Sequence, residues 1–563
     1  MDFLGLDIET IKGRAKLICL SDGRFFKVNF FEDILKFFKT FKSQNFLSYN
    51  ADYDIQSLLV YFPERVLDEL LLGIRLNYQG MSFQYIKNKF LKFGSNYIFD
   101  SYQYCKESLA VASERILGLK KLDVDASKIN VKNIYSPQTI AYCIQDALLS
   151  FKLFKHFYDG LPEKLKTVKP ISTAYYAAKY FEDELRENRV RQDINLLFRK
   201  GYHGGRFEIY QKGYFQKVFV YDINSAYPFE IMKLKGLKSC KILKLKEYIR
   251  DADFSLYYVR VNLKDKYVSP VVYKYKGLSL YPVGDFGGYV TKGEYERILR
   301  MEPEILSAVH VFGNTTYPFE RKIKDLYYLK QVSKSSEVYK IMLNSLYGKT
   351  CQRTKRYVKD AEGEIFDVYQ SMDDDMYMEI EDISRSNFLY ASEITARTRL
   401  RLYDLVRKYP QDILAVQTDS VISLKELDLP LSSRIGEWKK VMWKEAYLLG
   451  SGIYFFRKND IWEAKIRGFN LKGERAERIL FKILKSKKDS VEFDTLKRFS
   501  IQEARRIHQE DIANQILSVI RTLNINFDKK RVWLEDWSSG EEIRYKKIKS
   551  LAIYLYRDLK ISS

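Results

Sequence analysis

The chain has 563 residues, and its 95 lysine and arginine residues exceed its 73 aspartate and glutamate residues, giving a formal net charge of +22. A chain of this length can bury several cores, and such a positive excess favours a polyanionic partner over a basic surface kept only for solubility. No apolar run approaches the roughly 18 to 20 residues of a membrane span, and the five cysteines form no Cys-x-x-Cys pair. We therefore expect a cytoplasmic protein without a secretory signal, membrane partner, disulfide framework or zinc site.

Two acidic residues share one face of a strand expected over residues 3–10. The period-2 alternation of a strand places Asp7 and Glu9 on this face and Leu6 and Ile8 on the other. Two neighbouring carboxylates repel each other unless a cation lies between them. This strand is therefore a candidate metal-binding element.

More polar residues of the same kind follow within the first 150 residues. Asp54 ends an Asn-x-x-Tyr-Asp segment, and Tyr142 and Asp146 stand at i and i+4 on a helix that Ser136-Pro137 is expected to start. Four acids and one tyrosine suit a two-metal hydrolysis in which an activated water attacks a phosphodiester.

A second pair of acids lies far from the first. The run of residues 218–221 predicts a buried strand that delivers Asp222 at its end, and the apolar runs 413–416 and 421–424 predict a hairpin whose turn holds Gln417, Thr418 and Asp419. Two strand-end carboxylates can bridge a pair of Mg²⁺ ions spaced by about 3.5 to 4 Å during phosphoryl transfer.

One helix face between these acids carries residues suited to a nucleotide. Lys340, Asn344 and Tyr347 recur at i, i+4 and i+7 and therefore share a face. The lysine offers a point charge to a triphosphate, and the tyrosine offers a flat surface to a nascent base pair.

The order YDINSAYP (221–228), KIMLNSLYGK (340–349) and VQTDSV (416–421) resembles motifs A, B and C of family B DNA polymerases. DIET (7–10), Asn50-x-x-Tyr53-Asp54 and Tyr142-x-x-x-Asp146 resemble the three motifs of the proofreading 3′-5′ exonuclease of the same enzymes. The resemblance implies an RNase H-like exonuclease domain, of α/β type around a mixed sheet, followed by a right-hand polymerase domain with palm, fingers and thumb.

The resemblance also implies roles for individual residues. Asp7, Glu9, Asp54 and Asp146 would hold exonuclease metals and Asp222 and Asp419 polymerase metals, two Mg²⁺ per site, with Mn²⁺ as a substitute. Ser225, Tyr227, Lys330, Lys340, Asn344 and Tyr347 would contact the incoming deoxynucleoside triphosphate. Template and primer contacts would come from Thr10, Asn50, Tyr53, Ser101, Tyr102, Tyr202, Gly204, Gly205, Thr395, Arg399, Tyr454, Lys465 and Arg467. Lys121 is a further candidate for the exonuclease site, although a lysine beside an acidic turn is more often solvated.

The motifs suggest domain limits. We expect the exonuclease over 1–168, a helical linker ending in Tyr-x-Gly-Gly over 169–205, the palm over 206–470 with fingers at 321–350, and the thumb over 471–563. Segments 234–280 and 351–388 resemble in position two insertions of the protein-primed, phage-type branch, in which one docks a terminal priming protein and the other surrounds the template. Plain loops are the alternative for both segments.

Two departures from the family pattern bear on activity. Gly452-Ile-Tyr454 replaces Lys-x-Tyr, so that Lys465 and Arg467 of KIRG would have to supply the charge, and Gln417 replaces the first acid of motif C. We therefore expect a monomeric, protein-primed DNA polymerase with proofreading, encoded by a virus or plasmid-like element. The alternatives are an enzyme that uses a nucleic-acid primer or none, and a DNA-binding relative whose synthesis is impaired by Gln417.

Overall fold

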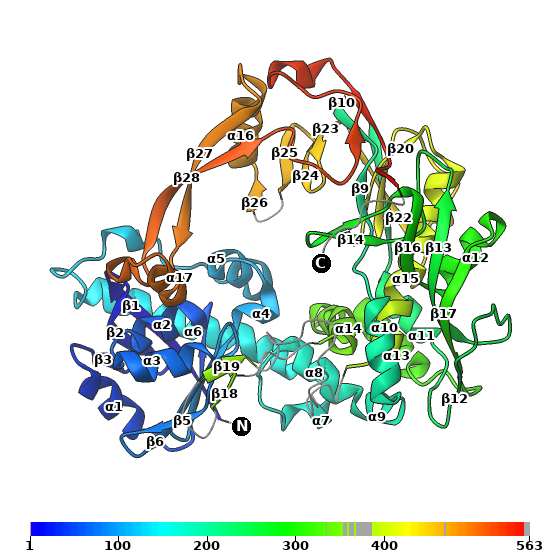
Figure 1. Ribbon diagram of the computed structural model, residues 1–563. Coiled ribbons are helices and arrows are strands. Elements are labelled where there is room, and N and C mark those ends of the chain that lie inside the picture. The colour runs from blue at the N-terminus through cyan, green and yellow to red at the C-terminus, as the bar shows by residue number, and fades with distance from the viewer. Residues whose placement is uncertain are drawn as a thin grey trace.

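The computed structural model describes residues 2–333, 335–352, 357–359, 365–367, 386–466 and 469–556. In Figure 1 the first 160 residues form one α/β unit, drawn in blue to cyan, and the remaining strands gather mostly on the opposite side of the molecule. The acidic patch 373–375 of the second insertion, and Arg467, lie outside the described residues. Among the residues described, no helix has both the length and the apolar character to cross a membrane.

The N-terminal unit is built on a mixed sheet of eight strands in the order β3-β2-β1-β4-β8-β7-β6-β5. Strands β1 (Phe3–Ile11), β4 (Asn45–Ser48) and β8 (Asn96–Asp100) are parallel, while β2 (Arg14–Leu20) and β3 (Phe25–Lys27) pair antiparallel beyond β1. Strands β5 (Leu76–Tyr78), β6 (Met81–Ile86) and β7 (Phe90–Phe93) form the other edge. This matches the expected α/β layer.

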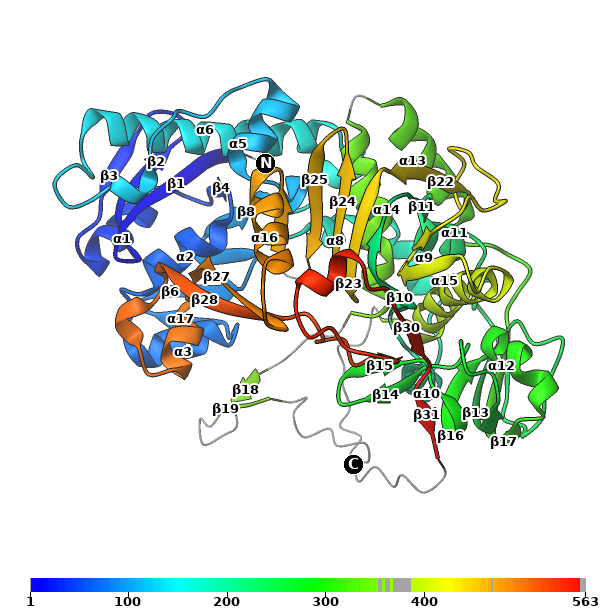
Figure 2. The ribbon, with the colours of Figure 1, turned by 90° about the horizontal axis from the view of Figure 1, so that it is seen from above.

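Helix α6 (Pro137–Asp159) lies along this sheet against β1, β2 and β4 (Figure 2). It begins as predicted, because the Ser136 hydroxyl accepts a hydrogen bond from the Thr139 amide and Pro137 occupies the first turn. Gly5 allows the close approach of strand and helix, since a Cβ there would lie 1.9 Å from the carbonyl oxygen of Ala147. The third acidic motif is thereby brought to the first.

A helical segment follows the N-terminal unit, over the range in which the linker is expected. It contains α8 (Thr173–Tyr180), α9 (Glu182–Glu187) and α10 (Gln192–Lys200). Helices α13 (Glu320–Val332) and α14 (Ser336–Thr350) pack against each other, and α14 also packs against α8. The expected finger segment is therefore a helix pair that rests on the linker.

The second group of acids lies on an antiparallel sheet of order β22-β11-β21-β20-β9. Its strands are β9 (Phe207–Ile209), β11 (Val218–Ile223), β20 (Ile413–Gln417), β21 (Ser420–Ser423) and β22 (Trp438–Trp443). One face is covered by the long helix α15 (Phe388–Lys408), and Tyr221, Val416 and Leu402 share a core there. The short helix α11 (Ala226–Met232) packs against α15.

The first insertion extends beyond its predicted end at residue 280. Its strands belong to a sheet of order β12-β17-β13-β16-β31. Because β16 (Val283–Thr291) pairs with β13 (Phe254–Leu263), and β17 (Glu304–Phe312) with both β13 and β12 (Lys241–Leu243), a boundary at 280 would divide this sheet. Strand β31 (Tyr554–Leu555) comes from the other end of the chain and pairs with β16.

The predicted limit at residue 470 also falls within a sheet, of order β26-β25-β24-β23-β10-β30-β29. It joins β10 (Gln211–Phe215), β23 (Glu445–Gly450), β24 (Ile453–Lys458), β25 (Ile461–Ile466), β26 (Phe469–Lys472), β29 (Val532–Trp533) and β30 (Ile548–Leu551). Helix α16 (Glu474–Leu484) shares its core. Beyond α16, the hairpin of β27 (Ser490–Arg498) and β28 (Ile516–Asn524) crosses to the N-terminal unit (Figure 1).

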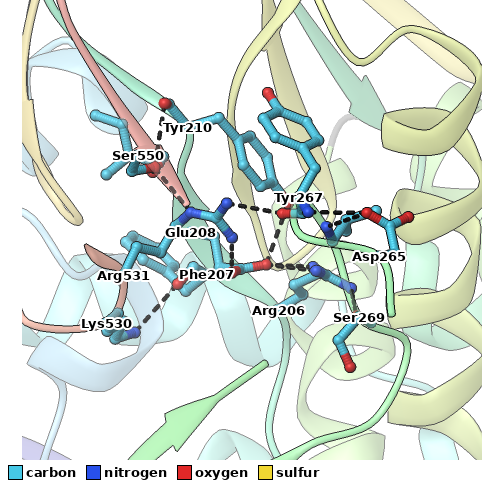
Figure 3. Close-up of polar contacts among 12 residues, drawn as sticks. Arg206, Phe207, Glu208, Tyr210, Asp265, Tyr267, Ser269, Lys530, Arg531 and Ser550 are labelled. Carbon is cyan, nitrogen blue, oxygen red and sulfur yellow. Dashed lines mark hydrogen bonds and ion pairs between the residues drawn. The ribbon is translucent and has the colours of Figure 1, made fainter. Parts of the chain in front are cut away.

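A buried ion network ties this C-terminal part to the sheet that carries Asp222 and Asp419. Glu208 accepts from Arg206 and from Arg531, and all three side chains are at most 2% exposed. Figure 3 shows how Arg531 also reaches Ser550 and the Tyr267 carbonyl, while Arg206 donates to the Ser269 carbonyl. Four distant segments are therefore held at one point.

Two candidate metal-dependent active sites

The four N-terminal acids converge between β1, α2 (Ala51–Leu59) and α6. Burial raises the pKa of Asp7, and the charges of Asp54 and Asp146 raise it further. Burial followed by Asp146 raises the pKa of Glu9 to about 7, and burial also raises the pKa of Asp54 and Asp146. Such crowding disfavours four ionised carboxylates unless a cation compensates them.

The donor set suits a divalent cation. Asp146 Oδ1 is buried without a hydrogen-bond partner among the described residues, and ligand atoms of Asp7, Glu9 and Cys143 lie within 4.8 Å of one another. Carboxylate oxygens are the ligands that Mg²⁺ and Mn²⁺ prefer. Asp7, Glu9, Asp54 and Asp146 would hold the metal, and Ser48 already fixes Asp54 through a hydrogen bond from its hydroxyl.

Lys121 belongs to this site. Its Nζ lies 2.5 Å from Asp146 Oδ2 and 4.6 Å from the centre of the Tyr142 ring. Burial opposes the charge of Lys121, but Asp146 outweighs burial and keeps the pKa of the ammonium above its ordinary value. Among the described ion pairs, Lys121 is the one cation in direct contact with these acids. Burial raises the pKa of the neighbouring Tyr142 to about 12.

Residues expected to hold a single strand lie beside these acids. The Thr10 hydroxyl and the Tyr53 hydroxyl are 2.7 Å apart, and Asn50 is exposed in a left-handed conformation immediately before α2. Tyr102 is 39% exposed, but Ser101 is buried and donates to the Ser48 carbonyl. The predicted strand contact of Ser101 is therefore corrected to a bond within the protein.

The second pair of acids is placed by strand pairing. Asp222 of β11 lies opposite Ser420 of β21, and the amide of Ile223 donates to the Asp419 carbonyl at 2.9 Å. The hairpin forms as predicted, except that its turn is Thr418-Asp419 and Gln417 ends β20, with Thr418 in a left-handed conformation. Burial, followed by the charge of Asp222, raises the pKa of Asp419 to about 6.

Lysines surround this pair. Lys439 Nζ, on the neighbouring strand β22, lies 2.6 Å from Asp222 Oδ2. Lys330 donates to the Ser225 hydroxyl at 3.2 Å, and burial followed by Lys340 and Lys439 lowers the pKa of Lys330. Such a group of cations beside two carboxylates fits a triphosphate with its divalent cation.

Three tyrosines contact one another near the hairpin of β20 and β21. The ring centres of Tyr227 and Tyr347 are 4.4 Å apart, and the Tyr202 hydroxyl lies 2.5 Å from that of Tyr347. A Cβ on Gly205 would lie 2.8 Å from Thr418 and 3.0 Å from the Tyr227 hydroxyl, so only glycine permits this approach. Asn344 and Lys340 are exposed on the same helix as Tyr347. Motifs A, B and C and the Tyr-x-Gly-Gly segment therefore converge.

A cavity of about 470 Å³ borders Gln417. Its lining includes Gly205, Tyr454, Lys465 and Lys530. The Nε2 atom of Gln417 and the hydroxyl of Tyr454 are buried without hydrogen-bond partners among the described residues. Polar atoms left without partners beside a cavity indicate a site that is completed by a ligand or by water.

Two further predicted DNA contacts are corrected by burial. Thr395 is 0% exposed, and its hydroxyl donates to the Ala391 carbonyl on its own helix. Arg399 is 1% exposed and donates to the carbonyls of His203 and Gly204 and to Glu294. Arg399 thus stabilises the backbone of the Tyr-x-Gly-Gly segment from within the protein core. Tyr454 is also 0% exposed but lines the cavity beside Gln417, so its contact with DNA stays a prediction.

Sequence reasoning missed Lys439. Its strand carries a Lys-Lys pair within Trp438–Trp443, which is typical of a solvated strand face. Only the pairing of β22 with β11 shows that Lys439 lies opposite Asp222. No local signal could have revealed this contact.

Comparison with known proteins identifies the family. A model of DNA polymerase type B, organellar and viral, matches residues 34–404. The chain belongs to this family of type B DNA polymerases. A DNA polymerase of Acidianus bottle-shaped virus (isolate Italy/Pozzuoli) is 26% identical over 399 residues, covering 65% of this chain and 54% of the relative. A probable DNA polymerase of Podospora anserina is 25% identical over 225 residues, covering 38% of this chain and 18% of that protein. The chain therefore spans about half of the first relative and less of the second.

Solved structures give the fold of this type B family member. Phi29 DNA polymerase complexed with primer-template DNA and incoming nucleotide is similar with a TM-score of 0.67 at 15% identity, over 93% of this chain and 99% of that chain. Phi29 DNA polymerase complexed with single-stranded DNA gives a TM-score of 0.66 over 93% and 100% of the two chains. The fold expected from the sequence, an exonuclease domain followed by a right-hand polymerase domain, is confirmed.

Proposed function

We propose that this chain is a DNA-directed DNA polymerase with a 3′-5′ proofreading exonuclease. The observation that carries the proposal is the convergence of Asp222 and Asp419 with Tyr227, Tyr347 and a group of lysines, from four separate segments of the chain. Divalent cations held by the two acids would stabilise the attacking and leaving oxygens of the phosphoryl transfer.

The chain's own residues would bind and orient the nucleotide. Lys330, Lys340 and Lys439 would neutralise the triphosphate, with Ser225 adding a hydroxyl beside Lys330. Tyr347 would support the base pair, and Tyr227, whose ring it contacts, would close the space in which a 2′-hydroxyl has to fit.

The exonuclease would act on the unpaired 3′ end. Thr10 and Tyr53, joined through their hydroxyls, and the exposed Asn50 would hold the strand beside the four acids. Tyr142 and Lys121 would orient water and offset the charge of Asp146. Phi29 DNA polymerase, whose fold this chain shares, has been solved with single-stranded DNA and with primer-template DNA.

We assign the regions accordingly. The unit 1–168 would be the exonuclease, the helices of 169–205 the linker, and the sheet with Asp222 and Asp419 the palm. Helices α13 and α14 would form the fingers, and α16 with the β27–β28 hairpin the thumb. Residues 530–551 would return to the palm, to which Arg531 binds.

The test is incorporation of labelled deoxynucleotide on a primed template in Mg²⁺, with Asp419→Asn as the matched inactive control. Asparagine keeps the size of the side chain and removes the charge needed to hold a cation. We expect full-length product from the wild type and none from the variant. Equal products from both proteins would contradict the proposal.

We further propose that synthesis starts on the hydroxyl of a terminal priming protein. The sheet inserted at 241–312 and the position of a second segment before α15 support this mode. Without a nucleic-acid primer but with the candidate priming protein, labelled product should migrate with protein and shift after protease treatment. Product that forms only with an oligonucleotide primer would favour nucleic-acid priming.

A DNA-binding relative with impaired synthesis is the second candidate. It rests on Gln417, which stands where the family has an acid and whose Nε2 is buried without a partner among the described residues. DNA binding without synthesis at any Mg²⁺ or Mn²⁺ concentration, with synthesis restored by Gln417→Asp, would support this candidate.

A further inference from the structure

The tip of the β27–β28 hairpin is embedded in the exonuclease unit. It carries the short helix α17 (Ile501–Arg506), and Ile501 is 2% exposed within the core of the N-terminal sheet. The Ile501 amide donates to Gln56 Oε1 at 2.9 Å, on the same helix as Asp54. The hairpin thus packs on this unit and does not merely touch its surface.

Asn514 links the tip to two places in the N-terminal unit, the turn after Thr10 and the backbone of Tyr53. It is 0% exposed, and its Nδ2 donates to the Gly13 carbonyl at 3.2 Å and to the Tyr53 carbonyl at 3.0 Å. Gly13 ends the turn that follows Thr10, and a Cβ there would lie 2.4 Å from the Ala513 carbonyl. The contact therefore requires glycine at position 13, where a side chain would collide with Ala513, and the buried amide group of Asn514.

Arg498 binds the same segment beside Asn514. Its guanidinium donates to the Asp52 carbonyl at 2.9 Å, lies 3.0 Å from Asp52 Oδ2, and sits 5.4 Å from the centre of the Tyr53 ring. Its Nε donates to Asn514 Oδ1 at 3.0 Å. Arg498 and Asn514 are therefore one hydrogen-bonded pair facing the Asp52-Tyr53-Asp54 turn of α2.

Other contacts of the tip lie away from this turn. Arg505 pairs with Glu64 at 2.6 Å and with Asp68, both on α3 (Glu64–Leu71). The two acids are 75% and 51% exposed, so this pairing is weak. The tip therefore combines a docking contact with a separate, buried contact to the turn that carries Tyr53 and Asp54.

We propose that the hairpin tip is a working part of the exonuclease site. Asn514 and Arg498 act as positioning residues that fix Tyr53 against Thr10, so that the 3′ end of a single strand finds its binding groups already in place. The inference rests on the proposed exonuclease function. It means that proofreading requires a polymerase element more than 440 residues away in sequence from the turn it holds.

The test measures steady-state degradation of an end-labelled single strand by full-length variants. Asn514→Gly removes the amide and tolerates the left-handed conformation of residue 514, and Arg498→Met removes the guanidinium at similar length. We expect the KM for the strand to rise about tenfold, as for loss of a charged or buried hydrogen bond, with kcat changed less than about twofold. Arg498→Lys should recover part of the loss.

Arg505→Met is the matched control, because it weakens docking without touching the turn. Its KM should stay within about twofold of the wild-type value, and the thermal unfolding of all variants should confirm that they fold. An unchanged KM in Asn514→Gly and Arg498→Met, or an equal rise in Arg505→Met, would overturn the inference. A wild type that degrades no single strand would instead overturn the exonuclease proposal, and the inference with it.

Discussion

The two acidic sites differ in how their charge is balanced. The N-terminal site has four carboxylates, all with raised pKa values, and the one described ion pair among them joins Asp146 to Lys121. The polymerase pair is two carboxylates among lysines, of which Lys439 contacts Asp222 directly while Lys330 and Lys465 lie nearby. The first site has fewer lysines than carboxylates, whereas the second has more lysines than carboxylates.

This difference indicates when each site takes up a cation. Crowded carboxylates gain from a divalent ion even without substrate. A pair that is already partnered by lysine gains less, until a triphosphate brings four further negative oxygens and engages those lysines. On the proposed function, the exonuclease site would therefore take up its cation before the strand arrives, and the polymerase site would take up its cations together with the nucleotide.

The separation of the two sites gives the largest expected effect. Asp7→Ala with Glu9→Ala should lower single-strand degradation by about 1000-fold, because the metal ligands are lost, and should leave primer extension within about twofold. Both rates can be measured on one labelled oligonucleotide, with and without template and nucleotide. Loss of both activities together would show that the two sites are not independent.

The sheet that carries Asp222 and Asp419 can be destabilised without changing the N-terminal acids. Burial disfavours the charge of Glu208, but Arg206 and Arg531 outweigh burial and hold the pKa of Glu208 below its ordinary value. Glu208→Gln leaves two buried guanidinium groups without their partner and should cost about 3 kcal/mol of unfolding free energy at neutral pH. Equal unfolding free energies of the wild type and Glu208→Gln, measured with denaturant, would show that this network does not stabilise the fold.

The same network gives a pH dependence with a definite sign. Because the folded pKa of Glu208 is depressed, its stabilisation is full above the ordinary glutamate pKa and is lost as the pH falls through the folded value. The gap in stability between the wild type and Glu208→Gln should therefore be constant near neutral pH and narrow in acid. A gap that widens in acid would contradict the assignment.

Sugar selection isolates one residue of the polymerase site. Shortening Tyr227 to valine should open space under the sugar and reduce discrimination against ribonucleotides by about 100-fold. Tyr347→Val is the control, since its ring contacts Tyr227 but faces the expected base pair, and it should slow both nucleotides equally. Competition assays with paired nucleotides measure this ratio, and unchanged discrimination in Tyr227→Val would exclude it as the gate.

The smallest expected effect concerns Gln417. Gln417→Asp adds one negative charge beside Asp419 and should lower the Mg²⁺ concentration for half-maximal synthesis by about three- to tenfold, while Mn²⁺ should support the wild type better than Mg²⁺. The Mg²⁺ requirement of the exonuclease is the internal control and should not change. A shift in both requirements would point to an effect away from the polymerase site.

Local patterns predicted the elements that carry the acids. The Ser136-Pro137 helix start, the strand before Asp222 and the motif C hairpin all formed, because each depends on residues adjacent in sequence. The direction in which a helix face points is different, since it depends on packing. Thr395 and Arg399 share a face as predicted, but that face lies in the core.

Contacts between distant segments could not be predicted. The end of the first insertion was placed too early because β16 pairs back to β13, and Lys439 was missed because β22 reaches β11 only in the folded sheet. No local pattern marks Arg498 and Asn514, whose partners appear only where the hairpin tip packs on the N-terminal unit. A local sequence pattern identifies a helix or a strand, whereas tertiary packing decides which other segment that helix or strand contacts.

The central claim is that two separate metal sites have opposite charge balance, and Mn²⁺ binding to the nucleotide-free protein tests it most directly. Calorimetric titration of the wild type should show binding that disappears in Asp7→Ala with Glu9→Ala and persists in Asp222→Asn with Asp419→Asn. Addition of a deoxynucleoside triphosphate and primed template should then add sites that the second pair of substitutions abolishes. Nucleotide-free binding that is lost with Asp222 and Asp419 but kept without Asp7 and Glu9 would contradict the account.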